Sequence, residues 1–312
     1  MLRDLSLRCA SAGLTLLALS IFGFALLVLL PGDFAEVVLI NQLDGELPSP
    51  EALAKFKAQE GFDQPLPVQY LNWLGATLSG DFGVSFTTGD PVTAELGLRI
   101  VATFRLVGLA FCLTAVFGGL LGVIAALNRG SIVDRLVTAV AISGMSVPNF
   151  WQSLLFVLLF SLTLGWLPSS GYGGLSHAIL PAAVIATASM GLTARYVRAS
   201  LIEALAAPHV RTALAKGLSP RATLFSHALP AALPGILTLL GLQAARMFDG
   251  AIVVETIFAW PGLGRLFVDA ILNRDYPVLQ AAILAVGTTY ILINLAVDCA
   301  AAALDPRMRR AV

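Results

Sequence analysis

The chain has 312 residues, of which 57% are hydrophobic and only 12% are charged. Soluble domains usually devote about a quarter of their residues to charged side chains, so this composition indicates a protein that lies in lipid. The composition as a whole excludes a disordered chain, a disulfide scaffold and a nucleic-acid binder, and the 19 basic and 19 acidic residues balance. The three cysteines are far apart and no C-x-x-C spacing occurs, so we expect them to be packing residues.

Six apolar segments are long enough to cross a bilayer, because a helix needs about 20 residues to span about 30 Å of hydrocarbon. The first follows Arg3 and Arg8, as in a signal peptide, but no small-x-small cleavage site comes after it, so we expect a retained span. The sequence therefore predicts an all-α membrane protein with six transmembrane helices at roughly 9–30, 104–127, 136–164, 178–199, 229–257 and 278–303.

Basic residues in the connections predict the orientation of these spans. The connections at 128–135 and 195–227 are rich in lysine and arginine, the connection at 165–177 has neither, and the one at 259–277 has two arginines. Because positively charged connections stay on the cytoplasmic side, we expect both termini to be cytoplasmic.

Residues 31–99 are then expected outside the membrane. They contain ten acidic and three basic residues. Ser49 followed by Pro50 is typical of a helix start, and residues 68–78 predict a second, amphipathic helix. Tyr70 and Trp73 lie on one side of that helix and could either pack onto the bundle or lie in a membrane-surface belt.

Searches for catalytic motifs find none. There is no Walker A loop, no H-E-x-x-H, no G-x-S-x-G and no Rossmann glycine pattern. The three histidines, His177, His209 and His227, are too scattered in the sequence for a metal site. The sequence therefore predicts no catalytic residue, no bound metal and no cofactor on this chain, and the chain is not expected to be an enzyme.

A cytoplasmic helical hairpin is predicted between the fourth and fifth spans. Residues 203–216 read as helix, Gly217 as its stop, and Ser219-Pro220 as a second helix start. An ordinary amphipathic connection between two spans, with no special function, would show the same pattern.

At this hairpin the sequence resembles the integral-membrane subunits of ABC importers. Their motif begins E-A-A, has a glycine after three residues and continues, nine residues later, as I-x-L-P. With its first position on Arg211, Ala213, Gly217, Leu229 and Pro230 match. Arg211, Thr212 and His227 depart from it, and the resulting R-T-A-x-A-K-G resembles the peptide and nickel branch of the family.

The resemblance covers essentially the whole chain and implies a type I importer permease fold in a single domain, 1–312, in the bacterial inner membrane. It also implies four kinds of partner: a second permease subunit forming a heterodimer, two ATP-binding subunits, an extracytoplasmic solute-binding protein and membrane lipid. Further matching segments lie at 31–33, 61–66, 80–85, 146–151, 255–265, 274–278 and 305–307.

In such importers a short helix docks on each ATPase and converts its closure into rocking of the spans. For this chain the resemblance places the coupling loop at 200–228. Its three basic residues, Arg211, Lys216 and Arg221, could also be the positive charge usual in a cytoplasmic connection. The residues assigned to coupling are Glu203, Arg211, Thr212, Ala213, Lys216 and Gly217.

Charged residues at membrane depth form a second candidate site, because an ionised group in a bilayer needs a partner or a wet cavity. Arg246 and Asp249 are three residues apart and share a helix face. They either form an internal latch or line the translocation path, to which we also assign Asn149. Glu255 is assigned to structure, at the turn that begins near Phe258.

The short connection at 166–174 and the stretch 86–92 look more like nickel and opine-metallophore permeases than dipeptide permeases. We therefore expect half of an ATP-driven pathway for a nickel or other divalent metal chelate. The alternatives are a di- or oligopeptide importer and, more remotely, an ion-coupled secondary transporter, which would show discontinuous spans in two matching halves.

Overall fold

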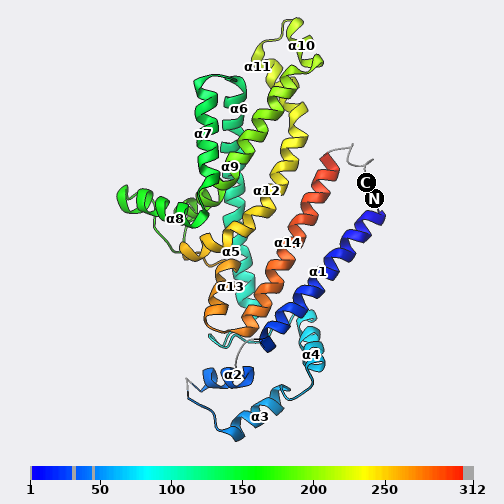
Figure 1. Cartoon of the computed structure of the whole chain (residues 1–312), viewed down its shortest axis with the longest axis vertical. Helices are drawn as coiled ribbons and strands as arrows, with labels where there is room; N and C mark the ends of the chain where they lie inside the picture. Colours follow the sequence, from blue (N-terminus) through cyan, green and yellow to red (C-terminus); the bar gives the residue numbers. More distant parts are fainter. Residues whose placement is uncertain (1, 30–32, 44–45, 305–312) are drawn as a thin grey trace. The chain divides into compact units, whose positions relative to one another are not determined.

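The computed structural model describes residues 2–29, 33–43 and 46–304, and every named element within them is helical. In chain order the α-helices are α1 (Leu2–Leu29), α2 (Phe34–Gln42), α3 (Pro50–Glu60), α4 (Leu66–Leu78), α5 (Val92–Leu113), α6 (Gly119–Leu127), α7 (Ile132–Ser146), α8 (Asn149–Phe156), α9 (Leu175–Ala206), α10 (Pro208–Ala215), α11 (Pro220–Thr223), α12 (Leu229–Ile257), α13 (Leu263–Leu272) and α14 (Tyr276–Leu304) (Figure 1). Three π-helical segments join them: η1 (Thr114–Gly118), η2 (Val157–Thr163) and η3 (Leu224–Ala228).

The predicted spans agree in part with these helices. Four helical stretches are long and apolar enough to cross a membrane, at Val92–Leu127, Leu175–Ala206, Pro220–Ile257 and Tyr276–Val297. A bent helix pair would make a fifth span, and Ala10–Leu26 forms a shorter apolar helix. The count of six spans is therefore not confirmed by the described residues.

The span predicted at 136–164 is not one straight helix. The chain breaks between α7 and the α8–η2 segment, and the helix direction bends there by 108°. Val147 is extended, with ψ 125°, and Pro148 follows it. A residue before proline is pushed out of the helical region by the proline ring, so the helix ends there.

Leucines on the bent segment show why this chain needs lipid. Leu154, Leu158 and Leu162 are all exposed, Leu162 by 70%. Soluble monomers rarely expose a contiguous apolar face of this kind, because the free-energy cost grows with the apolar area in contact with water.

The described residues divide into two compact units. The first comprises residues 103–260 together with 292–304, and the second comprises residues 2–102 together with 261–291.

In the first unit α9 is the central helix and packs against α6, α7 and α12. Its partners approach closely at glycines. A Cβ atom at Gly122 would lie 2.7 Å from the carbonyl oxygen of Ala194, and one at Gly191 would lie 2.1 Å from the carbonyl oxygen of Ala141. Small residues at such crossings allow helix backbones to touch, which is how helices associate in lipid.

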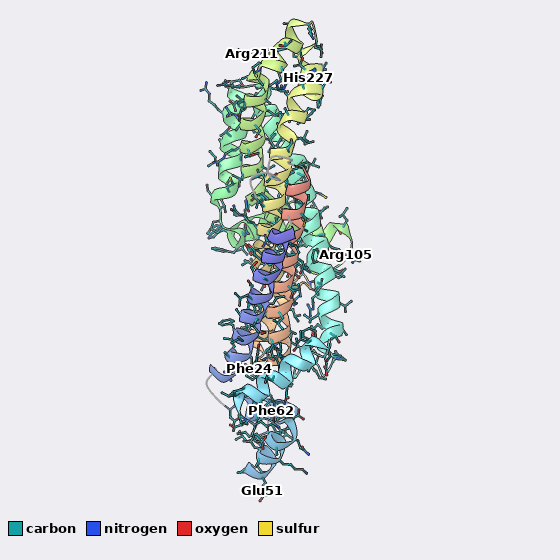
Figure 2. The ribbon with its side chains drawn as sticks, turned by 90° about the vertical axis from the view of Figure 1, so that its right-hand side faces the viewer. Phe24, Glu51, Phe62, Arg105, Arg211 and His227 are labelled. Atoms are coloured by element: carbon teal, nitrogen blue, oxygen red, sulfur yellow. The ribbon has the colours of Figure 1, made fainter. Side chains whose placement is uncertain are left out.

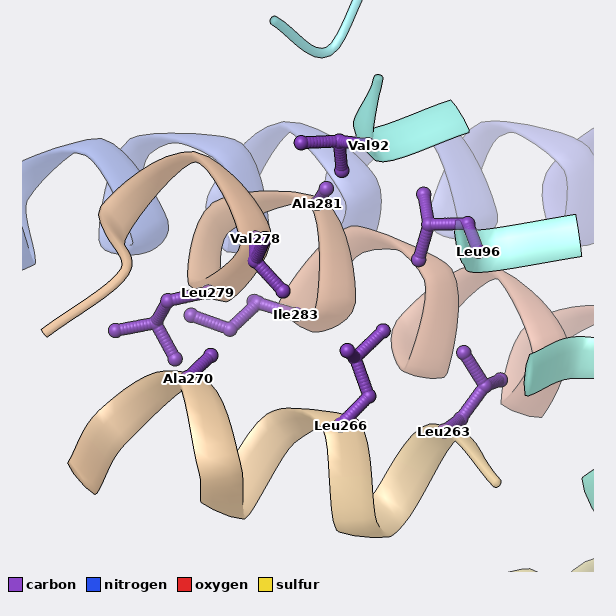
Figure 3. Packing of buried hydrophobic residues seen from close by; sticks show 9 residues of the cluster. All are labelled: Val92, Leu96, Leu263, Leu266, Ala270, Val278, Leu279, Ala281 and Ile283. Atoms are coloured by element: carbon purple, nitrogen blue, oxygen red, sulfur yellow. The ribbon is translucent and has the colours of Figure 1, made fainter. Parts of the chain in front are cut away.

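The second unit is built on a cluster of buried aliphatic side chains from α5, α13 and α14, including Leu96, Leu266 and Val278 (Figure 3). Asp275, 3% exposed, joins the 85–87 loop to the start of α14. Its carboxylate accepts hydrogen bonds from Ser85 Oγ at 2.5 Å and from the backbone N–H of Thr87 at 3.1 Å.

The two helices predicted between 31 and 99 are confirmed. Ser49 caps α3 by accepting a hydrogen bond from the N–H of Ala52 at 3.2 Å. On α4, the Tyr70 hydroxyl lies 2.9 Å from Ser20 Oγ of α1, and Phe24 of α1 packs against the rings of Tyr70 and Trp73. The structure therefore supports packing of these aromatic residues onto α1.

Candidate functional site

The predicted hairpin between α9 and α12 is present and its local geometry follows from the sequence. α9 ends at Ala206, and Pro208 begins α10, because proline lacks an N–H that the first helical turn would leave unpaired in any case. Gly217 follows α10 with φ +87°, a left-handed conformation that glycine adopts without strain. Ser219 then caps α11 through the N–H of Ala222 at 3.2 Å.

The residues predicted to couple divide into a buried one and an exposed group. Ala213 is buried, as is the nearby Val210, where α10 meets α9, α11 and η3. The other assigned residues are exposed, and the Thr212 hydroxyl donates to the carbonyl of Pro208 at 3.0 Å. Figure 2 shows Arg211 on this hairpin and His227 on the adjoining η3 segment.

The exposed side combines positive charge with apolar surface. Arg211, Lys216 and Arg221 are exposed, as are Leu214 (43%) and Phe225 (63%). Such a mixture of apolar anchors and basic side chains suits a protein partner better than water alone.

A partly buried ion pair that the sequence did not predict joins α7 to α9 in the first unit. Arg198 of α9 donates to both carboxylate oxygens of Asp134, from Nε at 2.6 Å and from Nη2 at 2.8 Å. The N–H of Gly130 adds a third bond at 2.9 Å. A bidentate pair of this kind fixes the relative orientation of the two side chains and also neutralises their charges. In the sequence, Arg198 belongs to the basic connection at 195–227 and indicates only a cytoplasmic position, although an acid such as Asp134 in another basic connection is a signal for such a partner.

The pair secures the end of α9 that leads into the hairpin. Asp134 is 4% exposed and lies in the first turn of α7, so α7 and α9 are tied together eight residues before α9 ends at Ala206. A displacement of α10 would therefore be transmitted to α7 as well as to α9.

The charged residues at membrane depth lie on α12. Arg246 and Asp249 are both exposed, and no ion pair between them is found in the described part of the chain. Asn149 approaches α12 at Gly250, the residue after Asp249, because its amide nitrogen would be 2.8 Å from a Cβ atom placed there. The structure thus places Asn149 of α8 against the stretch of α12 that carries the two charged residues. It does not show the latch.

Glu255 has the structural position that was expected of it. Its side chain is completely buried, and Oε1 accepts a hydrogen bond from the Thr103 hydroxyl at 2.6 Å. Its backbone carbonyl accepts from the N–H of Trp260 at 2.8 Å, which closes the turn after α12. Asp298, which the sequence also places near membrane depth in the sixth predicted span, has a side chain outside the described part of the structure.

No group of three or more histidine, cysteine, aspartate or glutamate side chains able to hold a metal ion occurs among the described residues. The long apolar helices, with an exposed basic hairpin between two of them, define the class of protein as a polytopic helical membrane protein.

The sequence matches the family described as binding-protein-dependent transport system inner membrane component over residues 118–310, and its N-terminal family over residues 1–107. The chain belongs to this family. It is the transmembrane component of an ABC importer, located in the inner membrane, and ATP hydrolysis takes place on partner subunits.

Full-length relatives support this assignment. A putative peptide transport system permease protein of Brucella abortus is 40% identical over 310 residues, covering 97% of both chains. A di/tripeptide transport system permease protein of Pseudomonas aeruginosa is 39% identical, with 95% of each covered. A glutathione transport system permease protein of Salmonella typhimurium is 38% identical, again with 95% of each covered.

Solved structures support the fold. An inward-facing MetNI methionine ABC transporter chain matches with a TM-score of 0.57 and 19% identity, covering 67% of this chain and 96% of that one. A chain of an amino acid ABC transporter with histidines gives a TM-score of 0.51 over 69% of this chain and 94% of that one. Both agree with the predicted type I importer fold.

Proposed function

We propose that this chain forms half of an ATP-driven import pathway for short peptides. The supporting observation is that relatives of 38–40% identity, matched over nearly their whole length, are named for peptide, di/tripeptide or glutathione transport. This favours the peptide alternative over the nickel chelate expected from the sequence. The two stretches that suggested nickel are short connections, and connections vary more among relatives than the helices they join.

Under this proposal the hairpin formed by α10 and α11 is the coupling segment that contacts an ATP-binding subunit. The second permease subunit forms the other half of the pathway, and residues 31–99 face outward, toward the solute-binding protein. The exposed basic and apolar side chains around Arg211 and Leu214 support the hairpin's role as a docking element.

The cargo can be tested with the assembled transporter and its binding protein in proteoliposomes. We expect ATP-dependent accumulation of labelled phenylalanyl-alanine, competed by unlabelled dipeptides and not by a nickel–histidine chelate. Accumulation of nickel with the chelator, without peptide uptake, would show that the proposal is wrong.

Arg246 and Asp249 are proposed to contact the charged ends of the peptide along its path. Replacing either with alanine should lower uptake about tenfold, because a hydrogen bond to a charged group contributes roughly 1.5–3 kcal/mol. The melting temperature should stay unchanged, since both side chains are exposed and unpaired with each other.

The control for these variants is Asp63→Ala, an exposed carboxylate of the 61–65 turn. It should leave uptake at the parental level. Recovery of both uptake and stability in the Arg246→Ala/Asp249→Ala double variant would instead support the latch.

A further inference from the structure

The second unit contains a cavity of about 890 Å³ that the transport pathway on α12 does not explain. Its walls come from α1, α2, α3, α4, the 81–89 loop and the first turns of α14. Small-molecule sites typically measure about 300–1,000 Å³, so the cavity has the size of a ligand site.

One side of this cavity is aromatic. Phe24 packs against Trp73 with ring centroids 5.9 Å apart, and Phe56 packs against Phe62 at 6.0 Å; all four rings line the cavity. Figure 2 shows Phe24 on α1 and Phe62 just beyond α3. Fixed rings of this kind offer an apolar side chain a surface that needs little rearrangement.

A residue in the wall of this cavity carries a buried amide group whose nitrogen has no hydrogen-bond partner in the described part of the chain. Gln280 of α14 lines the cavity, is 5% exposed, and its Nε2 has no hydrogen-bond acceptor among the described residues. A buried donor without an acceptor lowers the stability of the fold, and an acceptor on a ligand would remove that penalty.

The charges around the cavity are predominantly negative. Lys57 forms an ion pair with Asp33, which joins α3 to the start of α2. Glu60 and Asp81 also line the cavity, are exposed, and have no ion pair in the part of the chain that the structure describes. The unpaired carboxylates favour a cationic group at this edge of the cavity.

We propose that the cavity binds the amino-terminal end of a short peptide with an apolar side chain. The carboxylate of Glu60 attracts the terminal ammonium, Nε2 of Gln280 donates to a peptide carbonyl oxygen, and the aromatic wall contacts the side chain. This inference rests on peptides being the cargo, and it adds a binding site on the permease that precedes the membrane path.

The test uses the full transporter in lipid nanodiscs without its solute-binding protein, with labelled phenylalanyl-alanine in equilibrium dialysis. We expect saturable binding that Gln280→Leu weakens about tenfold, in line with the loss of one hydrogen bond. The matched control is Gln59→Leu, an exposed glutamine of α3 that does not line the cavity, and it should bind as the parent does. Equal binding by both variants and the parent would overturn the proposal.

A second variant changes only the edge of the cavity, where a folding defect is not expected. Glu60→Gln should weaken binding of phenylalanyl-alanine and leave binding of its N-acetylated form unchanged, because only the free ammonium meets the carboxylate. Equal effects on both peptides, or none on either, would contradict the assigned contact. Weakened docking of the solute-binding protein by Gln280→Leu, with unchanged peptide binding, would identify a protein contact and overturn the ligand site.

The uptake assay separates this inference from the proposed function. Peptide uptake without Gln280-dependent binding in nanodiscs would reject the cavity site alone. Absence of peptide uptake, with accumulation of a metal chelate, would reject the proposed cargo and the cavity proposal with it.

Discussion

Gly217→Val should abolish peptide uptake by the assembled transporter while ATP hydrolysis continues. Gly217 has φ +87°, and no atom lies within 4 Å of a Cβ placed there, so the substitution strains the backbone without a clash. A left-handed conformation costs an L-residue about 1–2 kcal/mol, and a β-branched side chain adds to this. The turn between α10 and α11 would relax into another conformation, and the hairpin would lose the rigidity that coupling requires.

The measurement is uptake and ATPase activity of the same proteoliposomes. Gly165→Val is the matched control, because Gly165 has φ +65° and equally open space but lies outside the hairpin and does not line the cavity of the second unit. The control should transport normally. If Gly217→Val also transports normally, or if both variants lose uptake alike, the hairpin is not the coupling element.

Gly191→Ala should strongly destabilise the first unit, because the added methyl group has no room between α7 and α9. The new Cβ would lie 2.1 Å from the carbonyl oxygen of Ala141 and 2.6 Å from Cγ of Met145. The Met145 side chain can turn away, but the Ala141 carbonyl belongs to the α7 backbone, so α7 and α9 must separate. Overpacking a tight interior costs about 1–3 kcal/mol, and a backbone clash lies at the upper end of that range.

Thermal melting of the purified chain in detergent would measure this effect. Gly119→Ala is the control, because Gly119 begins α6 in the same unit and a Cβ there meets nothing within 4 Å. The control should melt with the parent, and Gly191→Ala should melt well below both. Similar melting of all three proteins would show that the close approach of α7 and α9 is not required.

Local sequence signals determined the hairpin correctly. A glycine after the helix, a serine at the next cap and a proline after that serine predict a stop and a start without reference to the rest of the chain, and Gly217, Ser219 and Pro220 take those roles. The same holds for Ser49 at the start of α3. Each signal acts through bonds within a few residues, so the sequence alone contains the information.

The family and four of the apolar spans were also predictable, because both depend on the order and spacing of residues along the chain. Pro148 lies inside the span predicted at 136–164, and a membrane helix can tolerate an internal proline. Whether a proline bends a helix or ends it depends on whether neighbouring helices supply hydrogen-bond partners for the backbone groups that the proline frees. Here α7 ends at Ser146.

The tertiary structure alone decided which distant groups meet. Asp134 and Arg198 are 64 positions apart, and their pairing follows from α7 packing along α9. Gln280 of α14 lines the same cavity as residues of α1 to α4, and only the folded chain shows that its Nε2 is buried there without an acceptor among the described residues. Sequence patterns report the preference of each segment for helix or for lipid. Contacts between segments depend on close packing of particular residues. The close approach of Gly191 to the Ala141 carbonyl is such a contact, and only the folded structure reveals it.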